Sequence, residues 1–421
     1  MLRVDMADTN KNSREFDLVL WGASGFTGRL VAEHLFEVYG IDRDLHWAMA
    51  GRNAQKLEQI RSGLGAGAAQ IPILIGDSSD AASLNAMTGR TRVVCTTVGP
   101  YLKHGEGMLA ACATSGTDYC DLTGEVLFIR KMIDRYEPDA QRTGARIVNA
   151  CGFDSLPSDL GTLYIQNEFK KKYGHYASDV RYRLKVAKGT FSGGTIDSML
   201  NTLDTVKADA SLRNIFANPY ALNPAAQQRG RDGKDQRAAA FDAQFGAWTA
   251  PFVMAGINTR VVRRSNAIMG YPWGEDFSYT EAVATGAGFG GRLKATLLGV
   301  GLGAFMFAAS NKLLRALMFR MFLPKPGEGP TAEQRRDGFF NIAFLASDES
   351  GNRLRGKLTG DRDPGYGATS RMLGETAVCL AKDLGPEMPG GFWTPAASVG
   401  ERLIGRLTEN AGIQFSVTGT S

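Results

Sequence analysis

The chain has few of the residues that build disulfide frameworks and metal sites. Its 421 residues include five cysteines and four histidines. The cysteine count is odd, no CxxC pair occurs, and no two histidines stand at ligand spacing. These absences argue against a disulfide scaffold or a zinc site, so we expect no metal and a reducing compartment.

The chain also has no strong excess of charge of one sign and no apolar signal segment at the N-terminus. Lys and Arg number 48 against 43 Asp and Glu, and no basic run is interleaved with aromatics. We therefore expect no nucleic-acid partner. The N-terminus lacks the apolar region of a secretory signal, which predicts a cytoplasmic protein with a disordered tail over 1–14. The 51 glycines show no Gly-X-Y period, which excludes collagen.

The first part of the chain alternates apolar β-type runs with helical runs. The pattern predicts an α/β, Rossmann-type doubly wound parallel sheet over 15–150. The expected strands are 16–21, 46–50, 71–75, 92–97, 118–122 and 146–150.

After Cys151 the pattern changes to longer strands and helices, which predicts a second, α+β domain over 151–365 for substrate binding or dimerisation. Its expected antiparallel strands are 180–186, 252–263, 277–284, 341–347 and 353–360. Residues 222–240 are polar and read as a surface loop. Residues 366–421 should form C-terminal helices and a strand that pack back on the Rossmann domain.

A glycine-rich turn directly follows the first strand and opens a helix. Gly22, Gly25 and Gly28 give GxxGxxG spacing, which supplies a tight turn and backbone that can approach a pyrophosphate at a helix N-terminus. Ser24, Phe26 and Thr27 complete this cofactor-binding segment. The alternative is an ordinary glycine turn.

The second strand ends at Arg52, where an NAD enzyme usually carries an acidic residue for the ribose 2′-hydroxyl. An arginine can meet a 2′-phosphate, so we expect NADP as the cofactor. Lys56, one helical turn on, could share this role. The alternative for Arg52 is a solvated surface side chain.

Two further loops follow strands at the carboxyl edge of the expected sheet. Asp77 could hydrogen-bond the adenine or cap the next helix at 78–80. Val98, Gly99 and Pro100 follow the fourth strand and should run along the nicotinamide ribose.

Five ordered motifs carry a resemblance to a known family: GASGFTGRLVAEHL, AGRNAQKL, TTVGPY, YCDLTGE and NACGFDSLPSDLG. The chain resembles the saccharopine dehydrogenase-like oxidoreductases, within the group of trans-acting enoyl reductases and saccharopine dehydrogenase-like proteins. The resemblance implies an NADP-type Rossmann domain joined to an α+β domain, with the active site between them. It also implies Gly22, Ser24, Gly25, Phe26, Arg52 and Gly99 as cofactor neighbours.

Enoyl reduction requires a hydride on the β-carbon, a proton on the α-carbon and a donor to the enolate oxygen. Tyr101 could donate to that oxygen, His104 could relay a proton, and Asp154 is the third catalytic candidate. Their structural alternatives are a packing tyrosine, a helix-start histidine and a cap of the helix after Pro157.

A run of 17 uncharged residues lies between Lys294 and Lys312 within an apolar helix expected over 293–323. With Arg315 and Arg320 following, it reads either as an interfacial helix on an anionic bilayer or as a core or homodimer-interface helix. The first alternative predicts peripheral contact at the inner face of the plasma membrane.

Three functions remain open at this stage. The chain is an NADPH-dependent enoyl reductase acting on a small-molecule lipid or acyl substrate, an imine reductase of the saccharopine dehydrogenase type, or a lipid-associated nucleotide-binding protein without turnover.

Overall fold

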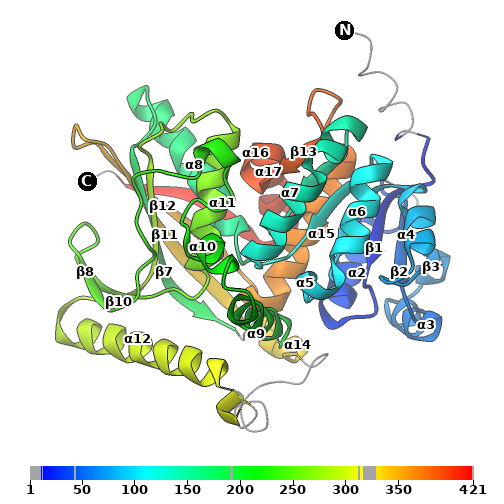
Figure 1. The fold of residues 1–421 in the computed structure, drawn as a ribbon, viewed down its shortest axis with the longest axis horizontal. Coiled ribbons are helices and arrows are strands. Elements are labelled where there is room, and N and C mark those ends of the chain that lie inside the picture. The colour runs from blue at the N-terminus through cyan, green and yellow to red at the C-terminus, as the bar shows by residue number, and fades with distance from the viewer. Residues whose placement is uncertain are drawn as a thin grey trace. The chain divides into compact units, whose positions relative to one another are not determined.

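The computed structural model describes residues 11, 13–41, 44–189, 193–311, 313–315 and 329–419. The chain forms two compact units, Met1–Phe153 with Tyr366–Ala411, and Asp154–Gly365 with Gly412–Ser421 (Figure 1). Residues 1–10 and 12 of the expected disordered tail lie outside the described part. The tail prediction needs a correction at its end, because the Lys11 Nζ donates to Asp118 at 2.8 Å and Arg14 donates to the Thr91 carbonyl at 2.7 Å.

The first unit is built on a seven-stranded sheet whose described pairs are all parallel. In spatial order the strands are β13 (Gly391–Trp393), β6 (Arg146–Val148), β5 (Asp118–Asp121), β4 (Thr91–Thr96), β1 (Phe16–Trp21), β2 (Trp47–Gly51) and β3 (Ile73–Ile75). All six residues of β1 are buried, as expected of a strand covered on both faces. The predicted doubly wound α/β class is confirmed.

Strand order reverses between β1 and β4, which are neighbours in the sheet although β2 and β3 separate them in the chain. Open α/β sheets bind ligands outside the carboxyl ends of the strands at such a switch point. The helices of this unit are α2 (Phe26–Tyr39), α3 (Ala54–Gly63), α4 (Ala81–Thr88), α5 (Tyr101–His104), α6 (Glu106–Ser115), α7 (Val126–Thr143), α15 (Thr369–Lys382), α16 (Pro395–Ser398) and α17 (Gly400–Asn410).

Helix α15 is fixed within the first unit by a buried polar contact with α2. The Glu375 carboxylate accepts a hydrogen bond from the Tyr39 hydroxyl at 2.6 Å and lies 2.7 Å from His34 Nε2. Segments more than 330 residues apart in sequence thus share one core.

The second unit is built on a mixed seven-stranded sheet. In spatial order its strands are β14 (Ile413–Gly419), β12 (Arg353–Gly360), β11 (Phe339–Ser347), β7 (Asp179–Lys188), β10 (Ser278–Gly286), β9 (Ala247–Ala250) and β8 (Ala240–Asp242). Its helices are α8 (Leu156–Tyr173), α9 (Gly193–Ala208), α10 (Leu212–Ala217), α11 (Ala255–Ile268), α12 (Gly288–Ser310) and α14 (Ala332–Arg336). The expectation of antiparallel strands is wrong for β7 and β10, which pair in parallel.

The strand predicted over 252–263 is wrong, because most of this stretch belongs to helix α11. Nearly the whole helix is buried, and two of its three arginines pair with aspartates of the loop 222–240. Arg260 pairs with Asp235 at 3.1 Å and Arg263 pairs with Asp232 at 2.7 Å. The predicted surface loop therefore supplies the partners for a buried helix.

The strand β14 requires a second correction. The segment 366–421 was expected to pack as one piece on the Rossmann domain, but β14 pairs antiparallel with β12 in the second sheet. Only Tyr366–Ala411 belongs to the first unit.

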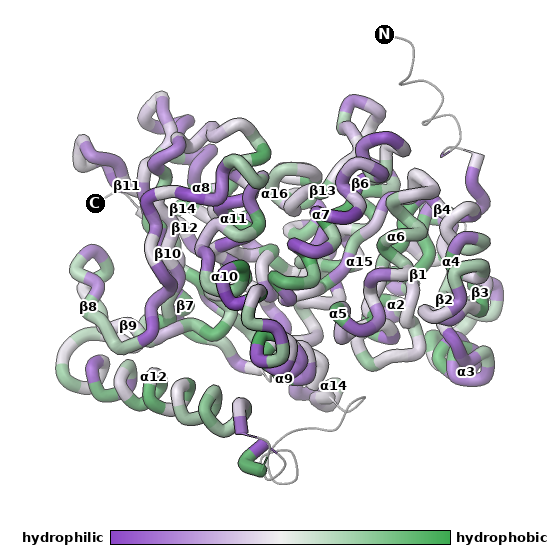
Figure 2. Tube along the Cα trace, viewed as in Figure 1, coloured by the Kyte–Doolittle hydropathy of each residue, from purple (hydrophilic) through white to green (hydrophobic). Residues whose placement is uncertain are grey.

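Helix α12 begins five residues before the predicted start and ends at Ser310. Residues 316–323 of the predicted segment, with Lys312 and Arg320, lie outside the described residues. Apolar residues predominate along α12 (Figure 2), and it packs against β8, β9, β10 and α9 of its own unit.

Candidate active site

The glycine-rich loop after β1 closes as a tight turn. Gly22 has φ 90°, a conformation that favours glycine, and the Gly25 N–H donates to the Gly22 carbonyl at 2.9 Å. Gly25 precedes helix α2, no side chain caps that helix end, and no acidic residue stands in its first turn. The backbone N–H groups at this helix start and the positive end of the helix dipole suit an anion such as a pyrophosphate.

Glycine is required for different structural reasons at the positions of this loop. A Cβ on Gly28 would lie 2.2 Å from the Gly22 carbonyl oxygen, so glycine is required for the helix to approach the turn. A Cβ on Gly25 would lie 3.3 Å from that same oxygen and meet no other atom within 4 Å. Gly25 is exposed, so its missing side chain leaves open space outside the protein backbone.

The loop after β4 packs directly on this turn. The Thr97 hydroxyl donates to the Gly22 carbonyl at 3.2 Å, and a Cβ on Gly22 would lie 2.7 Å from Val98 Cγ2. Gly99 is exposed and Pro100 half-buried. The switch point thus brings together the predicted segments 22–28 and 98–100 within one unit.

The remaining residues of the predicted cofactor-binding segment lie at the start of α2. Ser24, Phe26 and Thr27 are half-buried. The Phe26 ring meets Tyr366 edge-on at 4.7 Å, and the Arg29 guanidinium lies 5.5 Å from the centre of the same ring.

Arg52 is exposed directly after β2, and Lys56 is exposed one turn into α3. The Lys56 backbone N–H donates to Asn53, the N-cap residue of α3, at 2.9 Å. No carboxylate precedes α3 at this place. The arrangement suits a 2′-phosphate better than a bare ribose hydroxyl.

Asp77 does not cap a helix as the second alternative expected, because residues 78–80 form a turn after β3 and α4 begins at Ala81. Its carboxylate accepts from the Ser79 N–H at 2.8 Å and from the Ser79 hydroxyl at 2.6 Å. These hydrogen bonds hold the pKa of Asp77 below its ordinary value, and the charge of Arg52 acts in the same direction. Helix α4 itself is capped by Asp80.

Tyr101 matches the packing alternative. Its side chain is buried, its hydroxyl donates to the Thr96 carbonyl at 3.1 Å, and the Leu122 N–H donates to that hydroxyl at 3.4 Å. Burial raises the pKa of Tyr101 well above its usual range. A hydroxyl held in this way is poorly placed to serve an enolate.

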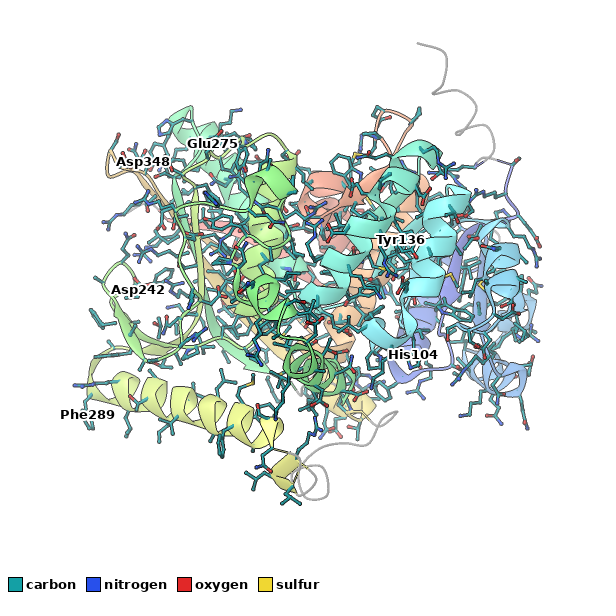
Figure 3. All side chains as sticks on the ribbon, in the orientation of Figure 1. His104, Tyr136, Asp242, Glu275, Phe289 and Asp348 are labelled. Carbon is teal, nitrogen blue, oxygen red and sulfur yellow. The ribbon has the colours of Figure 1, made fainter. Side chains whose placement is uncertain are left out.

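His104 ends the short helix α5 with an exposed side chain (Figure 3). Of the catalytic candidates in the first unit, it alone reaches solvent.

Two buried acids of the YCDLTGE motif were missed as site residues. The Glu125 carboxylate accepts from the backbone N–H groups of Tyr101 and Leu102 at 2.8 and 2.9 Å and so fixes the loop after β4. Asp121 accepts from the Ala150 N–H at 3.0 Å and from Asn149 Nδ2 at 2.8 Å after β6. The YCDLTGE motif was visible in the sequence. These hydrogen bonds join positions more than 20 residues apart, so spacing could not reveal them.

Asp154 is the first residue of the second unit, and the preceding Phe153 is fixed within the first unit, where its N–H donates to Thr369 Oγ1 at 3.0 Å. The capping alternative for Asp154 is wrong. Helix α8 begins at Leu156 with Ser155 as its N-cap residue, and the Asp154 carboxylate has no hydrogen bond within the described residues. Burial raises the pKa of Asp154 to about 7, so the group can hold a proton at neutral pH.

The residue after Asp154 is tied into a buried polar network of the second unit. The Ser155 hydroxyl donates to Asn258 Oδ1 at 3.0 Å, and Asn258 Nδ2 donates to Glu281 at 2.9 Å. The Tyr279 hydroxyl donates to the other Glu281 oxygen at 2.7 Å. Burial raises the pKa of Glu281 to about 7. The network fixes the start of α8 and, with it, the backbone next to Asp154.

Curated relatives match nearly the whole chain. A trans-acting enoyl reductase of Mycobacterium bovis is 36% identical over 423 residues, covering 97% of this chain and 99% of the relative. The chain belongs to the trans-acting enoyl reductase family. A Mycobacterium tuberculosis relative that carries this name provisionally is 41% identical, with 96% and 98% covered. The family resemblance of the motifs is thereby confirmed, and the family name is that of an oxidoreductase.

A solved structure agrees on the fold. Apo saccharopine dehydrogenase from Saccharomyces cerevisiae matches with a TM-score of 0.52 at 11% identity, covering 96% of this chain and 99% of that chain. The match shows a saccharopine dehydrogenase-like fold. No protein-family model matches the chain.

Proposed function

We propose that this protein is an NADPH-dependent enoyl reductase that reduces a carbon–carbon double bond in a lipid or polyketide acyl intermediate. The observation that carries the cofactor assignment is the uncapped start of α2 at the switch point, with exposed Arg52 after β2. The names of the relatives support the reaction class.

Different groups of the chain would bind different parts of the cofactor. The Gly22–Gly25 turn and the α2 N–H groups would hold the pyrophosphate, and Arg52 with Lys56 would hold the 2′-phosphate. When bound, NADPH supplies the hydride for the β-carbon. Tight packing of Gly22 on the loop after β4 would keep these contacts rigid.

Asp154 is the proton donor that we favour. An enoyl reduction leaves an enolate whose α-carbon needs a proton, and a carboxylic acid with a pKa near 7 can deliver one at neutral pH. His104 is the alternative donor because its side chain is exposed.

The decisive experiment follows NADPH oxidation by the loss of reduced-nicotinamide absorbance, with α,β-unsaturated acyl thioesters of increasing chain length. A parallel arm offers amino-acid and keto-acid pairs that form imines. Turnover of the thioesters supports the proposal. Turnover of the imine pairs alone would assign the chain to imine reduction, and NADPH binding without turnover in both arms would support a non-enzymatic role.

A further inference from the structure

The outer face of α12 carries large apolar side chains that are exposed. Phe289 is 80% exposed, Leu297 63% and Phe307 70%. Figure 3 labels Phe289 near the start of α12. Leu293 and Val300 lie on the same face and are also exposed. We refer to these five residues as the α12 ridge.

The opposite face of α12 packs on its own unit partly through small residues. Gly291, Ala295 and Ala309 are buried, and a Cβ on Gly299 would lie 3.6 Å from Pro251. At about 100° per residue, the ridge positions fall roughly opposite this line of small residues. The helix therefore buries a narrow stripe and turns its largest apolar groups outward.

Helix α12 is long and apolar enough to cross a membrane, but only 11% of its most apolar window is buried in the protein. A crossing is incompatible with the folded unit. The helix packs along β8 and β9, and β8 is the edge strand of its sheet. An open sheet edge cannot enter hydrocarbon, since its backbone groups would lose their hydrogen bonds.

Basic residues flank the ridge on both sides, and α12 contains no acidic residue. Arg292 and Lys294 are exposed and stand about 100° from the ridge centre in opposite directions. The Arg292 guanidinium lies 5.3 Å from the centre of the Trp248 ring, and Trp248 meets the exposed Phe241 at 5.7 Å. Aromatic and basic groups beside an apolar surface are typical of a membrane interface.

We propose that α12 docks the protein peripherally on an anionic lipid bilayer, with the ridge in the acyl boundary and Arg292 and Lys294 at the phosphates. This proposal does not rest on the enzymatic function. A second copy of the chain fits the ridge less well. A second α12 offers no carboxylate to the basic flanks, and five side chains supply on the order of a few hundred Å² per copy, below the roughly 800 Å² of a stable interface.

The structure changes which basic residues we expect at the membrane contact. Arg315 pairs with Asp204 at 2.7 Å and is largely neutralised there. The test therefore uses Arg292 and Lys294.

The full-length protein is sedimented with phosphatidylcholine vesicles with and without phosphatidylserine, at low and high salt. We expect the wild type to bind only the anionic vesicles and to dissociate at high salt. Arg292→Glu with Lys294→Glu should weaken binding about tenfold or more, since each basic residue contributes ~1 kcal/mol near an anionic surface. A ridge variant, Phe289→Ser with Leu297→Ser and Phe307→Ser, should abolish binding and keep the wild-type melting temperature.

The control reverses two exposed lysines, Lys171→Glu with Lys172→Glu, at the end of α8. Asp348, which contacts His175 just after α8, lies at the other end of the unit from Phe289 (Figure 3). The control has the same net charge as the Arg292 and Lys294 variant and should still bind. Wild-type protein that stays in the supernatant, or equal loss in both charge variants, would overturn the proposal. So would a dimer in sedimentation velocity that the ridge variant converts to a monomer, because the ridge would then belong to a second copy.

Discussion

Asp121 holds the backbone N–H of Ala150 at 3.0 Å, and Ala150 has φ 62°, a conformation that alanine rarely adopts. The carboxylate also accepts from the Thr123 N–H at 3.1 Å. One buried acid therefore fixes the chain where it leaves β5 and where it leaves β6. Strained residues persist only where their surroundings hold them, and this one lies four residues before Asp154.

Asp121→Ala should destabilise the first unit by ~2–4 kcal/mol, because several buried donors would lose their acceptor. The melting temperature of the variant measures this. Asp134→Ala serves as the control, since the Asp134 side chain is 60% exposed and pairs with Arg130 along α7. Equal melting temperatures for the two variants would contradict the prediction.

The glycine loop allows binding to be separated from folding. Gly25→Val should abolish NADPH binding at a much smaller cost in melting temperature than a change at Gly28, because Gly25 has φ −80° and its Cβ would lie 3.3 Å from the Gly22 oxygen. Gly28→Ala should lower the melting temperature as well, because its Cβ would lie 2.2 Å from the Gly22 oxygen. Fluorescence titration with NADPH and thermal melting measure both. Retained binding in Gly25→Val would move the phosphate site elsewhere.

Arg52→Ala should weaken NADPH binding about tenfold or more and leave NADH binding nearly unchanged. A charge-assisted hydrogen bond to a 2′-phosphate is worth ~1.5–3 kcal/mol, and ~1.4 kcal/mol corresponds to tenfold. Isothermal titration with both cofactors measures the ratio. Lys56→Ala should give a smaller loss. A wild type that binds both cofactors equally would contradict the NADP assignment.

Asp154→Asn should lower kcat by about 10²–10⁴ while the Kd for NADPH stays unchanged, since a general acid acts on the chemical step. Burial raises the pKa of Asp154 to about 7, so wild-type kcat should fall as the pH rises above that value. The residual activity of the variant should lack this inflection. A variant that keeps the wild-type pH profile would exclude Asp154 and turn attention to His104.

The stability of the protein should depend on pH because of the buried Glu281 carboxyl group. Its pKa rises from an ordinary 4.5 to about 7 because burial disfavours the charged form. The stability of the neutral form is thus fully present below about pH 4.5 and is lost as the pH rises through about 7. Glu281→Gln stays neutral, so its melting temperature should fall less than that of the wild type between pH 5 and pH 8. Glu349→Gln, at an exposed turn, should show no such trend.

The parts of the fold that depend on local pattern were predictable. The expected strand 16–21 coincides with β1, and the expected 46–50 differs from β2 by one residue at each end. Helix α11 was not predictable in this way. Its Val261 and Val262 favour a strand locally, and burial decided the outcome. The aspartates that pair with two of its arginines come from a loop more than 20 residues earlier.

In the candidate site, too, the residues that act locally were predictable and those that act through distant contacts were not. Gly22, Gly25 and Gly28 act within one turn, so spacing alone identified them. Tyr101 looked available for catalysis because nothing in the sequence reveals that Thr96 and Leu122 occupy its hydroxyl. Asp121 and Glu125 act through backbone groups on other loops, and only the folded chain shows those pairings.

The strand β14 has a consequence for how the protein is made. The chain passes between the two units after Phe153, after Gly365 and after Ala411, and β14 supplies the last strand of the second sheet. During synthesis, β12 is left with an unpaired edge until 413–419 emerges from the ribosome. The second sheet therefore stays incomplete until α17 and β14 have been synthesised, and an unpaired strand edge of this kind favours aggregation of the partly made chain.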